Sequence, residues 1–314
     1  MAGFTWTFDA PTGTYKQHAM STELYMAALE NTKFVEFADP VQGFGRKKGE
    51  NVTLTRIATI TEPTSITLTE GERIPEDTMS ITTTSITAAE IGRSVPYSSL
   101  SEDLSFLDVE NVIQRRLRDQ LALSLDTLAA TAFKTAKVKY IPTGLAAGTF
   151  DTDGTASTTA SANYNVFHAE EVRDYLFDTL QTPPRDGDNY VGIFRTLGLR
   201  GIKRDPDWET WHKYTDPQAK YTGEVGMIEN IRHIETNHAN ALAKKGTGSV
   251  LGEGVVFGTD AIALAEVLTP ELRAGIPEDH GRSKTVAWYG ILQFGIIWDT
   301  ANAGQARIVH ITSA

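Results

Sequence analysis

The sequence contains no cysteine, which excludes disulfide bonds, a thiolate nucleophile and a cysteine-ligated zinc site. No stretch approaches the roughly 20 apolar residues of a membrane-spanning helix. The first ten residues lack the basic start and apolar run of a secretory signal. Lysine and arginine number 29 against 40 acidic residues, for a net charge of −11. This acidic balance argues against a surface dedicated to binding duplex nucleic acid. It does not exclude a protein wall that only surrounds nucleic acid. We therefore expect a soluble chain made in a cytoplasm.

The motifs of the common catalytic sites are also missing. There is no metalloprotease pair of histidines four apart and no Gly-x-Ser-x-Gly elbow. The glycine-rich residues 246–258 do not connect a strand to a helix as a phosphate loop does. His233 and His238 are five residues apart where a strand is expected to run into a loop, which separates their side chains. We therefore predict no catalytic residue, no cofactor and no metal site. The alternative, an α/β enzyme with a flexible lid, would need titratable groups that converge in a pocket.

The most regular stretch that the sequence does contain is a predicted helix over residues 108–136. It has no glycine or proline, and Asp108 can cap its first turn. The apolar positions recur at steps of four and three, namely Val109, Ile113, Leu117, Leu121, Leu125, Leu128 and Ala132. A helix of this length is a rod of roughly 40 Å. Its apolar stripe drifts around the axis, so its two ends should pack against different neighbours.

A long β ribbon is predicted before this helix. Residues 51–60 and 80–91 alternate as strands, and residues 61–78, with two prolines and a glycine, form the turn between them. The ribbon is rich in threonine, which favours strands but supplies little apolar surface. Because a two-stranded ribbon is not stable alone in water, we infer that it lies on another copy of the chain. The alternative is that these are two strands of an ordinary sheet.

The rest of the chain predicts a mixture of helices and strands. Before the ribbon we expect an extended arm without a clear period and a helix over residues 21–37. Residues 143–163 are rich in Gly, Ala, Ser and Thr and predict a flexible loop. A short acidic turn or helix is predicted at 99–107, further helices at 165–180 and 196–204, and a loop at 270–280. Strands are predicted at 190–194, 224–235, 255–257, 261–267, 284–298 and 307–312.

The order of these parts resembles the major capsid proteins of tailed bacteriophages, which have the Hong Kong 97-type fold. More narrowly, the chain resembles the capsid proteins related to that of phage N-four. The stretches that carry the resemblance are residues 47–56, 68–71, 97–107, 121–127, 223–226, 234–236, 256–261, 285–289 and 296–299. Each motif is short, and their shared order over most of the chain is the stronger signal. Residues 143–163 and 238–254 match no motif of the family.

The resemblance implies an α+β fold and five segments. These are an N-terminal arm and helix (1–42), an extended loop (43–98), a peripheral domain (99–163) with its spine helix at 108–136, most of an axial domain (164–221) and return strands of both domains (222–314). It implies self-assembly into the pentamers and hexamers of an icosahedral head, built in the host cytoplasm and found in the virion. The partners would be other copies, a portal protein, scaffolding or decoration proteins, and double-stranded DNA held by enclosure. The alternative of the same fold is an encapsulin-like nanocompartment shell.

Charged residues along the ribbon and the helix are candidate contacts between subunits. They are Arg46, Lys47, Lys48, Arg56, Glu70, Arg73, Arg115, Arg116 and Arg118. A solvated face is the alternative, and an exposed ion pair contributes only about 0–1 kcal/mol. Gly43, Gly45 and Gly49 are candidate hinges of the ribbon.

Overall fold

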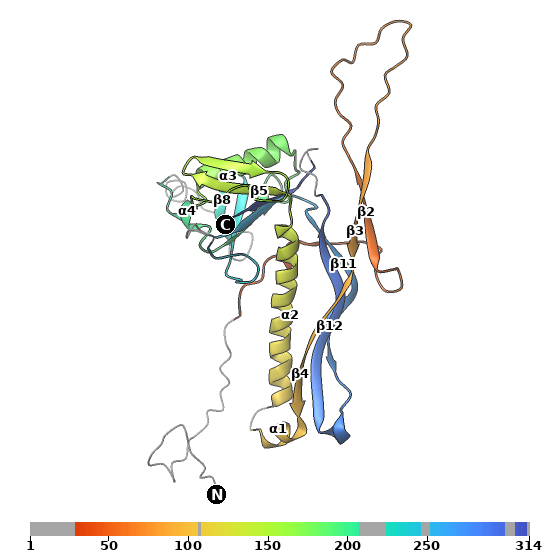
Figure 1. Ribbon diagram of the computed structural model, residues 1–314, viewed down its shortest axis with the longest axis vertical. Helices are drawn as coiled ribbons and strands as arrows, with labels where there is room; N and C mark the ends of the chain where they lie inside the picture. Colours follow the sequence, from red (N-terminus) through yellow and green to blue (C-terminus); the bar gives the residue numbers. More distant parts are fainter. Residues whose placement is uncertain (1–28, 106–107, 207–223, 246–251, 299–304, 313–314) are drawn as a thin grey trace.

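The computed structural model describes residues 29–105, 108–206, 224–245, 252–298 and 305–312. It is an elongated molecule with a long helix at its centre (Figure 1). A four-stranded sheet runs beside the helix, a seven-stranded sheet forms a globular unit at one end, and a two-stranded hairpin projects past that end. No helix in these ranges is long and apolar enough to cross a membrane.

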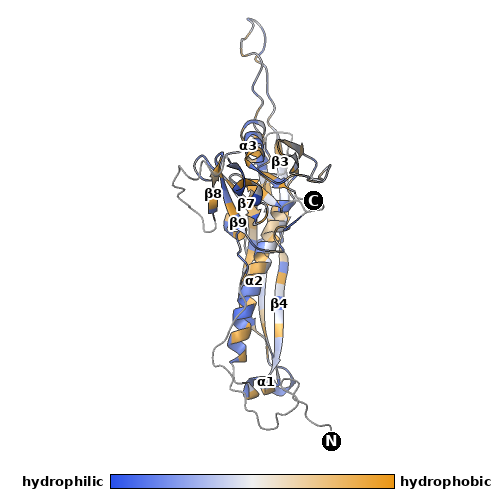
Figure 2. Ribbon diagram, turned by 90° about the vertical axis from the view of Figure 1, so that its left-hand side faces the viewer, coloured by the Kyte–Doolittle hydropathy of each residue, from blue (hydrophilic) through white to orange (hydrophobic). Residues whose placement is uncertain are grey.

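The central helix, α2, spans Val109–Lys134 and confirms the prediction for residues 108–136. The Asp108 side chain accepts a hydrogen bond from Asn111 N at 3.1 Å and caps its first turn. The two ends of α2 bury different faces, as the drifting stripe predicts. Leu117 packs against the four-stranded sheet, whereas Phe133 lies in the core under the seven-stranded sheet. Figure 2 shows the alternating polar and apolar stripes of this helix.

The four-stranded sheet has the order β1-β11-β12-β4. Its strands are β1 (Asp39–Pro40), β4 (Ala89–Ser98), β11 (Ile262–Ala274) and β12 (Ser283–Ile296). The face toward α2 holds Val286 and Trp288, and the Trp288 indole donates to Gln120 Oε1 at 3.2 Å. A short helix, α1 (Ser99–Leu104), follows β4 at the far end, and Ser98 caps it. The sequence predicts a short turn or helix over residues 99–107, and α1 is that helix.

The seven-stranded sheet has the order β6-β5-β13-β10-β7-β9-β8 and mixes parallel and antiparallel pairs. Its strands are β5 (Val138–Gly144), β6 (Ala147–Asp151), β7 (Tyr190–Arg195), β8 (Glu224–Ile228), β9 (Ile231–Thr236), β10 (Gly254–Phe257) and β13 (Ile308–Ile311). Helix α3 (Val166–Asp174), the π-helical turn η2 (Tyr175–Thr179) and the short α4 (Arg200–Lys203) accompany the sheet.

Both faces of the seven-stranded sheet are buried. Alternate residues of β7 and β10 show this, because Val255 and Phe257 pack toward α2 while Val256 packs toward α3. Strands of a sheet that is covered on both sides have nearly continuous apolar sequences, and the sequence of β10 (GVVF) has this pattern. The predicted helix at residues 165–180 is confirmed by α3 and η2, with Asn165 as its cap.

The hairpin consists of β2 (Asn51–Ile57) and β3 (Ile81–Thr87), with residues 58–80 between them. The return strand predicted over residues 80–91 is divided in two. β3 pairs with β2, and β4 then leaves the hairpin to pair with β12. The division falls at Ala88, whose amide makes the last hairpin contact by donating to Glu50 O at 2.9 Å.

Residues 21–28 of the helix predicted over residues 21–37 lie outside the described ranges. For the remaining residues the prediction is wrong. Residues 29–34 form no helix, and only Val35–Phe37 make one 3₁₀ turn. The amides of Lys33 and Phe34 donate to Asp126 instead of to backbone carbonyls. A tertiary contact therefore replaces the helical hydrogen bonds.

Three loop and helix boundaries also differ from the prediction. The segment 143–163 is not all loop, because β6 pairs with β5 and joins the seven-stranded sheet. The loop predicted at 270–280 begins later, since β11 continues through Pro270 to Ala274 across a register shift between Leu268 and Glu271. The helix predicted at 196–204 is limited to α4, four residues long.

Candidate functional site

The most exposed apolar surface of the molecule gathers on the projecting hairpin. Nearly half of the exposed large apolar side chains in the described ranges lie there: Ile57, Ile60, Ile66, Leu68, Ile74, Met79 and Ile81. The exposed fractions of Ile66 and Ile74 are 84% and 67%. The segment between the strands has no strand partner and stands away from both sheets (Figure 1). We call residues 58–80 the hairpin tip.

The root of the hairpin is fixed to the molecule. Ile86 on β3 is 5% exposed and packs against Ala263 and Ala265 of β11. The candidate contact residue Arg56 is buried here, and its guanidinium donates to Ile297 O at 3.4 Å. Arg56 therefore holds the hairpin to its own chain.

The hairpin tip is acidic as well as apolar. It carries Glu62, Glu70, Glu72, Glu76 and Asp77 against the single basic residue Arg73. Arg73 forms an ion pair with Glu76, and both side chains are largely exposed. The predicted contacts Glu70 and Arg73 thus lie at the tip, far from the other candidates.

A basic turn precedes the hairpin. Arg46, Lys47 and Lys48 are exposed, and Lys48 Nζ donates to Gly43 O at 2.6 Å. Gly43 and Gly49 adopt φ values of +81° and +101°, a conformation that side chains disfavour. Gly45 has no positive φ, so only two of the three hinge candidates need to be glycine.

The arginines of α2 lie apart from these groups, near the end of the molecule that carries α1. Arg116 Nη1 lies 3.3 Å from Asp119 Oδ2, while Arg115 and Arg118 are exposed to solvent. The nine charged candidates therefore do not form one cluster. They lie on the basic turn, on the root and tip of the hairpin, and on the polar face of the helix.

A buried carboxylate that the sequence did not reveal fastens the first described residues to α2. Asp126 is fully buried, and its Oδ1 accepts hydrogen bonds from Lys33 N at 2.8 Å and Phe34 N at 2.7 Å. Its Oδ2 lies 2.7 Å from Nδ1 of His238, which is also buried. One side chain thus joins three parts of the chain, and removing it would leave buried donors unpaired.

Two other buried histidines, His168 and His233, lie in the core of the seven-stranded sheet. His168 Nδ1 is 2.6 Å from the Tyr140 hydroxyl, and His233 stacks on Phe194 with ring centroids 5.3 Å apart. Burial lowers the pKa of each imidazole to about 4. His233 contacts the rings of Phe194 and Tyr164, whereas His238 contacts Asp126 of α2, so the two imidazoles lie in separate places. In the ranges that the structure covers, no three histidine or acidic side chains gather as ligands for a metal ion.

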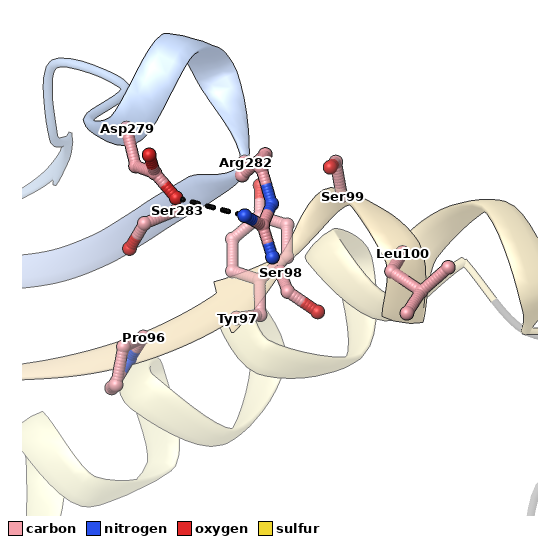
Figure 3. Close-up of a pocket in the computed structure, with 8 residues that line it drawn as sticks. All are labelled: Pro96, Tyr97, Ser98, Ser99, Leu100, Asp279, Arg282 and Ser283. Atoms are coloured by element: carbon pink, nitrogen blue, oxygen red, sulfur yellow. Dashed lines mark ion pairs between the residues drawn. The ribbon is translucent and has the colours of Figure 1, made fainter.

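A shallow pocket of about 330 Å³ opens at the far end of the four-stranded sheet (Figure 3). It is lined by Pro96, Tyr97, Ser98, Ser99, Leu100, Asp279, Arg282 and Ser283. Arg282 and Asp279 form an ion pair across 3.4 Å, and Ser98 Oγ accepts from Ser101 N as the cap of α1. No histidine in the lining can activate a serine. The backbone N–H of Ser99 donates to Arg282 O at 2.9 Å, which joins the start of α1 to the residue before β12.

We compared the chain with known protein families, sequences and structures. No family model and no curated protein sequence matches the chain. Solved structures of phage capsids match it over almost its whole length. The head structure of Helicobacter pylori bacteriophage KHP40 has a TM-score of 0.70 at 12% identity, covering 98% of this chain and 99% of that one.

Two further structures agree. The cyanophage Pam1 capsid asymmetric unit has a TM-score of 0.68 at 14% identity and covers 99% of this chain and 100% of the other. The capsid of Ralstonia phage GP4 has a TM-score of 0.67 at 16% identity and covers 99% and 97%. The narrower likeness to the phage N-four capsid proteins stays a prediction. The chain has the α+β fold of tailed-phage capsid proteins, the Hong Kong 97-type fold.

Proposed function

We propose that this chain is the major capsid protein of a tailed bacteriophage and assembles into the icosahedral head that encloses a double-stranded DNA genome. Its role is structural, without an active site. The full-length likeness to capsid and head structures supports the proposal. Its partners are other copies in pentamers and hexamers, together with a portal protein and scaffolding or decoration proteins. It assembles in the host cytoplasm and resides in the virion.

The observation that carries the proposal is the hairpin tip. An exposed apolar segment on a projecting arm marks an interaction site, because water does not favour such a surface. The tip stands away from the body of its own chain, so a neighbouring copy is the surface that can cover it (Figure 1). In the shell, the hairpin serves as the extended loop laid over the adjacent subunit.

The remaining parts take the roles that the resemblance implies. α2 and the four-stranded sheet form the peripheral domain, and the seven-stranded sheet forms the axial domain around the five- and six-fold axes. We also assign residues 138–151 to the axial domain, beside the predicted 164–221, and the pairing of β5 and β6 within that sheet supports this part of the proposal. A net charge of −11 suits an inner wall that does not hold DNA phosphates tightly.

Electron microscopy of the chain expressed alone tests this function. We expect closed particles, and a variant without residues 62–76 should give a soluble, folded subunit that forms none. Circular dichroism establishes that the variant is folded. Intact shells from the deletion variant would contradict the role of the hairpin tip.

Nuclease digestion of particles purified from the natural source separates the capsid from the nanocompartment alternative. A phage head protects double-stranded DNA, whereas a nanocompartment protects enzymes. None of the observations on this chain favours the second.

A further inference from the structure

A local excess of positive charge surrounds the short helix α4. Residues 195–205 and 241–245 carry six basic side chains and one acidic side chain, in a chain whose net charge is −11. Arg195 is half-buried, and the other five basic side chains are exposed. We call these five the α4 patch: Arg200, Lys203, Arg204, Lys244 and Lys245.

The two segments that form the α4 patch lie side by side. Glu253 N donates to Ala243 O at 3.1 Å, and Arg195 N donates to Glu253 O at 3.0 Å, so both segments bond to the same residue. A Cβ atom at Gly252 would lie 2.9 Å from Lys244 O and 3.0 Å from Arg195 Cβ. Only glycine allows this close approach. Residues 195 and 244 are therefore neighbours in space.

The two arginines of the patch lie on the same side of α4. Arg204 N donates to Arg200 O at 3.2 Å, which places these residues one helical turn apart. Ile202, between them in the sequence, is buried in the same core as Phe194 and anchors the helix. α4 lies on the side of the globular unit that faces away from the hairpin (Figure 1).

Most of the α4 patch has no acidic partner. Lys203 Nζ pairs with Glu235 Oε2 at 3.0 Å. Glu253, which contacts both segments, pairs with Lys134 at 3.3 Å instead of with a patch residue. Within the described residues, no carboxylate forms an ion pair with the other four patch residues, which are Arg200, Arg204, Lys244 and Lys245. Cations that are held close together without counterions create a positive potential that attracts a polyanion.

The composition of the patch favours nucleic acid over an acidic protein. None of the large apolar side chains that are exposed in the described ranges lies in residues 195–205 or 241–245. A protein partner would need such side chains at the centre of its interface. Double-stranded DNA instead presents one negative charge per about 1.7 Å, so it offers a phosphate to each cation in any register. Two of the four unpaired cations are arginines, whose planar guanidinium groups bind phosphate oxygens through two hydrogen bonds.

We propose that the α4 patch binds the phosphate backbone of double-stranded DNA without reading its sequence. The contact is weak, with a dissociation constant of about 10⁻⁴–10⁻⁶ M at physiological salt, and it allows the duplex to slide. The choice of DNA rests on the proposed function, since DNA is the polyanion that the head would enclose. The patch is then a local exception on an acidic chain, at which the globular unit touches the genome.

Fluorescence anisotropy of a short labelled DNA duplex tests the site. The full-length chain is used at concentrations at which light scattering detects no shells. The patch variant changes four residues to glutamine: Arg200, Arg204, Lys244 and Lys245. The matched control changes two arginines and two lysines that are equally exposed, on α2 and on the basic turn: Arg115, Arg118, Lys47 and Lys48. Thermal denaturation establishes that both variants are folded.

Four phosphate contacts predict that the binding constant of the original chain falls about 10²-fold between 50 mM and 200 mM salt. At 50 mM salt the patch variant should bind about tenfold or more weaker and lose most of this salt dependence. The control should bind within about threefold of the original chain. Equal losses in the two variants would overturn the proposal, and so would tighter binding of polyglutamate than of the duplex.

The outcome is separate from that of the proposed function. Shells formed by a chain that does not bind the duplex would overturn the α4 patch alone. A chain that binds the duplex through the patch but forms no shells would instead contradict the role as a capsid protein.

Discussion

Replacing the apolar side chains of the hairpin tip should block assembly without weakening the subunit. The change is Ile66→Ser, Leu68→Ser and Ile74→Ser in one variant. These side chains are 84%, 58% and 67% exposed in the isolated chain, so they contribute little to its own core. The free energy of unfolding of the unassembled subunit should therefore stay within about 0.5 kcal/mol of the original.

The effect on assembly is much larger. Complete burial of an aliphatic side chain contributes about 1.5–3 kcal/mol. Scaled by the exposed fractions, the three side chains contribute about 3–6 kcal/mol per subunit when a neighbour covers them. Since each 1.4 kcal/mol is a factor of ten, the concentration at which shells form should rise about 10²- to 10⁴-fold.

Light scattering over a dilution series measures this threshold, and chemical denaturation measures the stability of the subunit. The matched control is Thr64→Ser, Thr67→Ser and Thr69→Ser, which changes the same loop but removes only methyl groups. The control should assemble at a threshold close to that of the original chain. An unchanged threshold for the isoleucine and leucine variant would refute the reasoning.

Three other predictions concern the subunit itself. Asp126→Ala should lower the free energy of unfolding by about 3–5 kcal/mol because it leaves buried partners unpaired, and urea denaturation with an unchanged midpoint would contradict this. His168 and His233 have a folded-state pKa of about 4, below the value of about 6.5 in the unfolded chain. The unfolded state thus binds more protons between these pH values, and stability should fall by up to about 3 kcal/mol per histidine as pH drops from about 6.5 to 4. A stability that is flat between pH 7 and pH 4.5 would argue against it. Gly49→Ala should lower the free energy of unfolding by about 1–2 kcal/mol because φ is positive at this residue, whereas Gly45→Ala should lower it less. Equal shifts of the melting temperature in the two variants would disprove this difference.

The parts of the fold that the sequence predicted are those that local patterns determine. α2 has an uninterrupted helical period and an aspartate at its cap, and both act within a few residues. The buried strand β10 and the capped helix α3 are recognised for the same reason. The exposed hairpin was also predictable, because a threonine-rich ribbon lacks the apolar face that an ordinary sheet would bury.

The parts that the sequence did not predict depend on distant partners. Asp126 and His238 are 112 residues apart, so no local pattern marks them as a pair. The expected helix does not form over residues 29–34, because Asp126 accepts hydrogen bonds from the Lys33 and Phe34 amides that would otherwise bond within that helix. Pro270 suggested a loop, but a register shift allows β11 to continue past it. The charged contact candidates, chosen by composition, lie at several separate places.

The length of α2 has a mechanical consequence. Its last turns are embedded in the core below the seven-stranded sheet, and its first turns carry the far end of the four-stranded sheet. A stiff rod of 26 residues is about 39 Å long. A swivel of only about 5° at the embedded end would therefore sweep the opposite tip through about 3 Å, close to the diameter of a water molecule. The helix is in this sense a lever, which converts a small repacking of one core into a displacement large enough to make or break contacts at the other end.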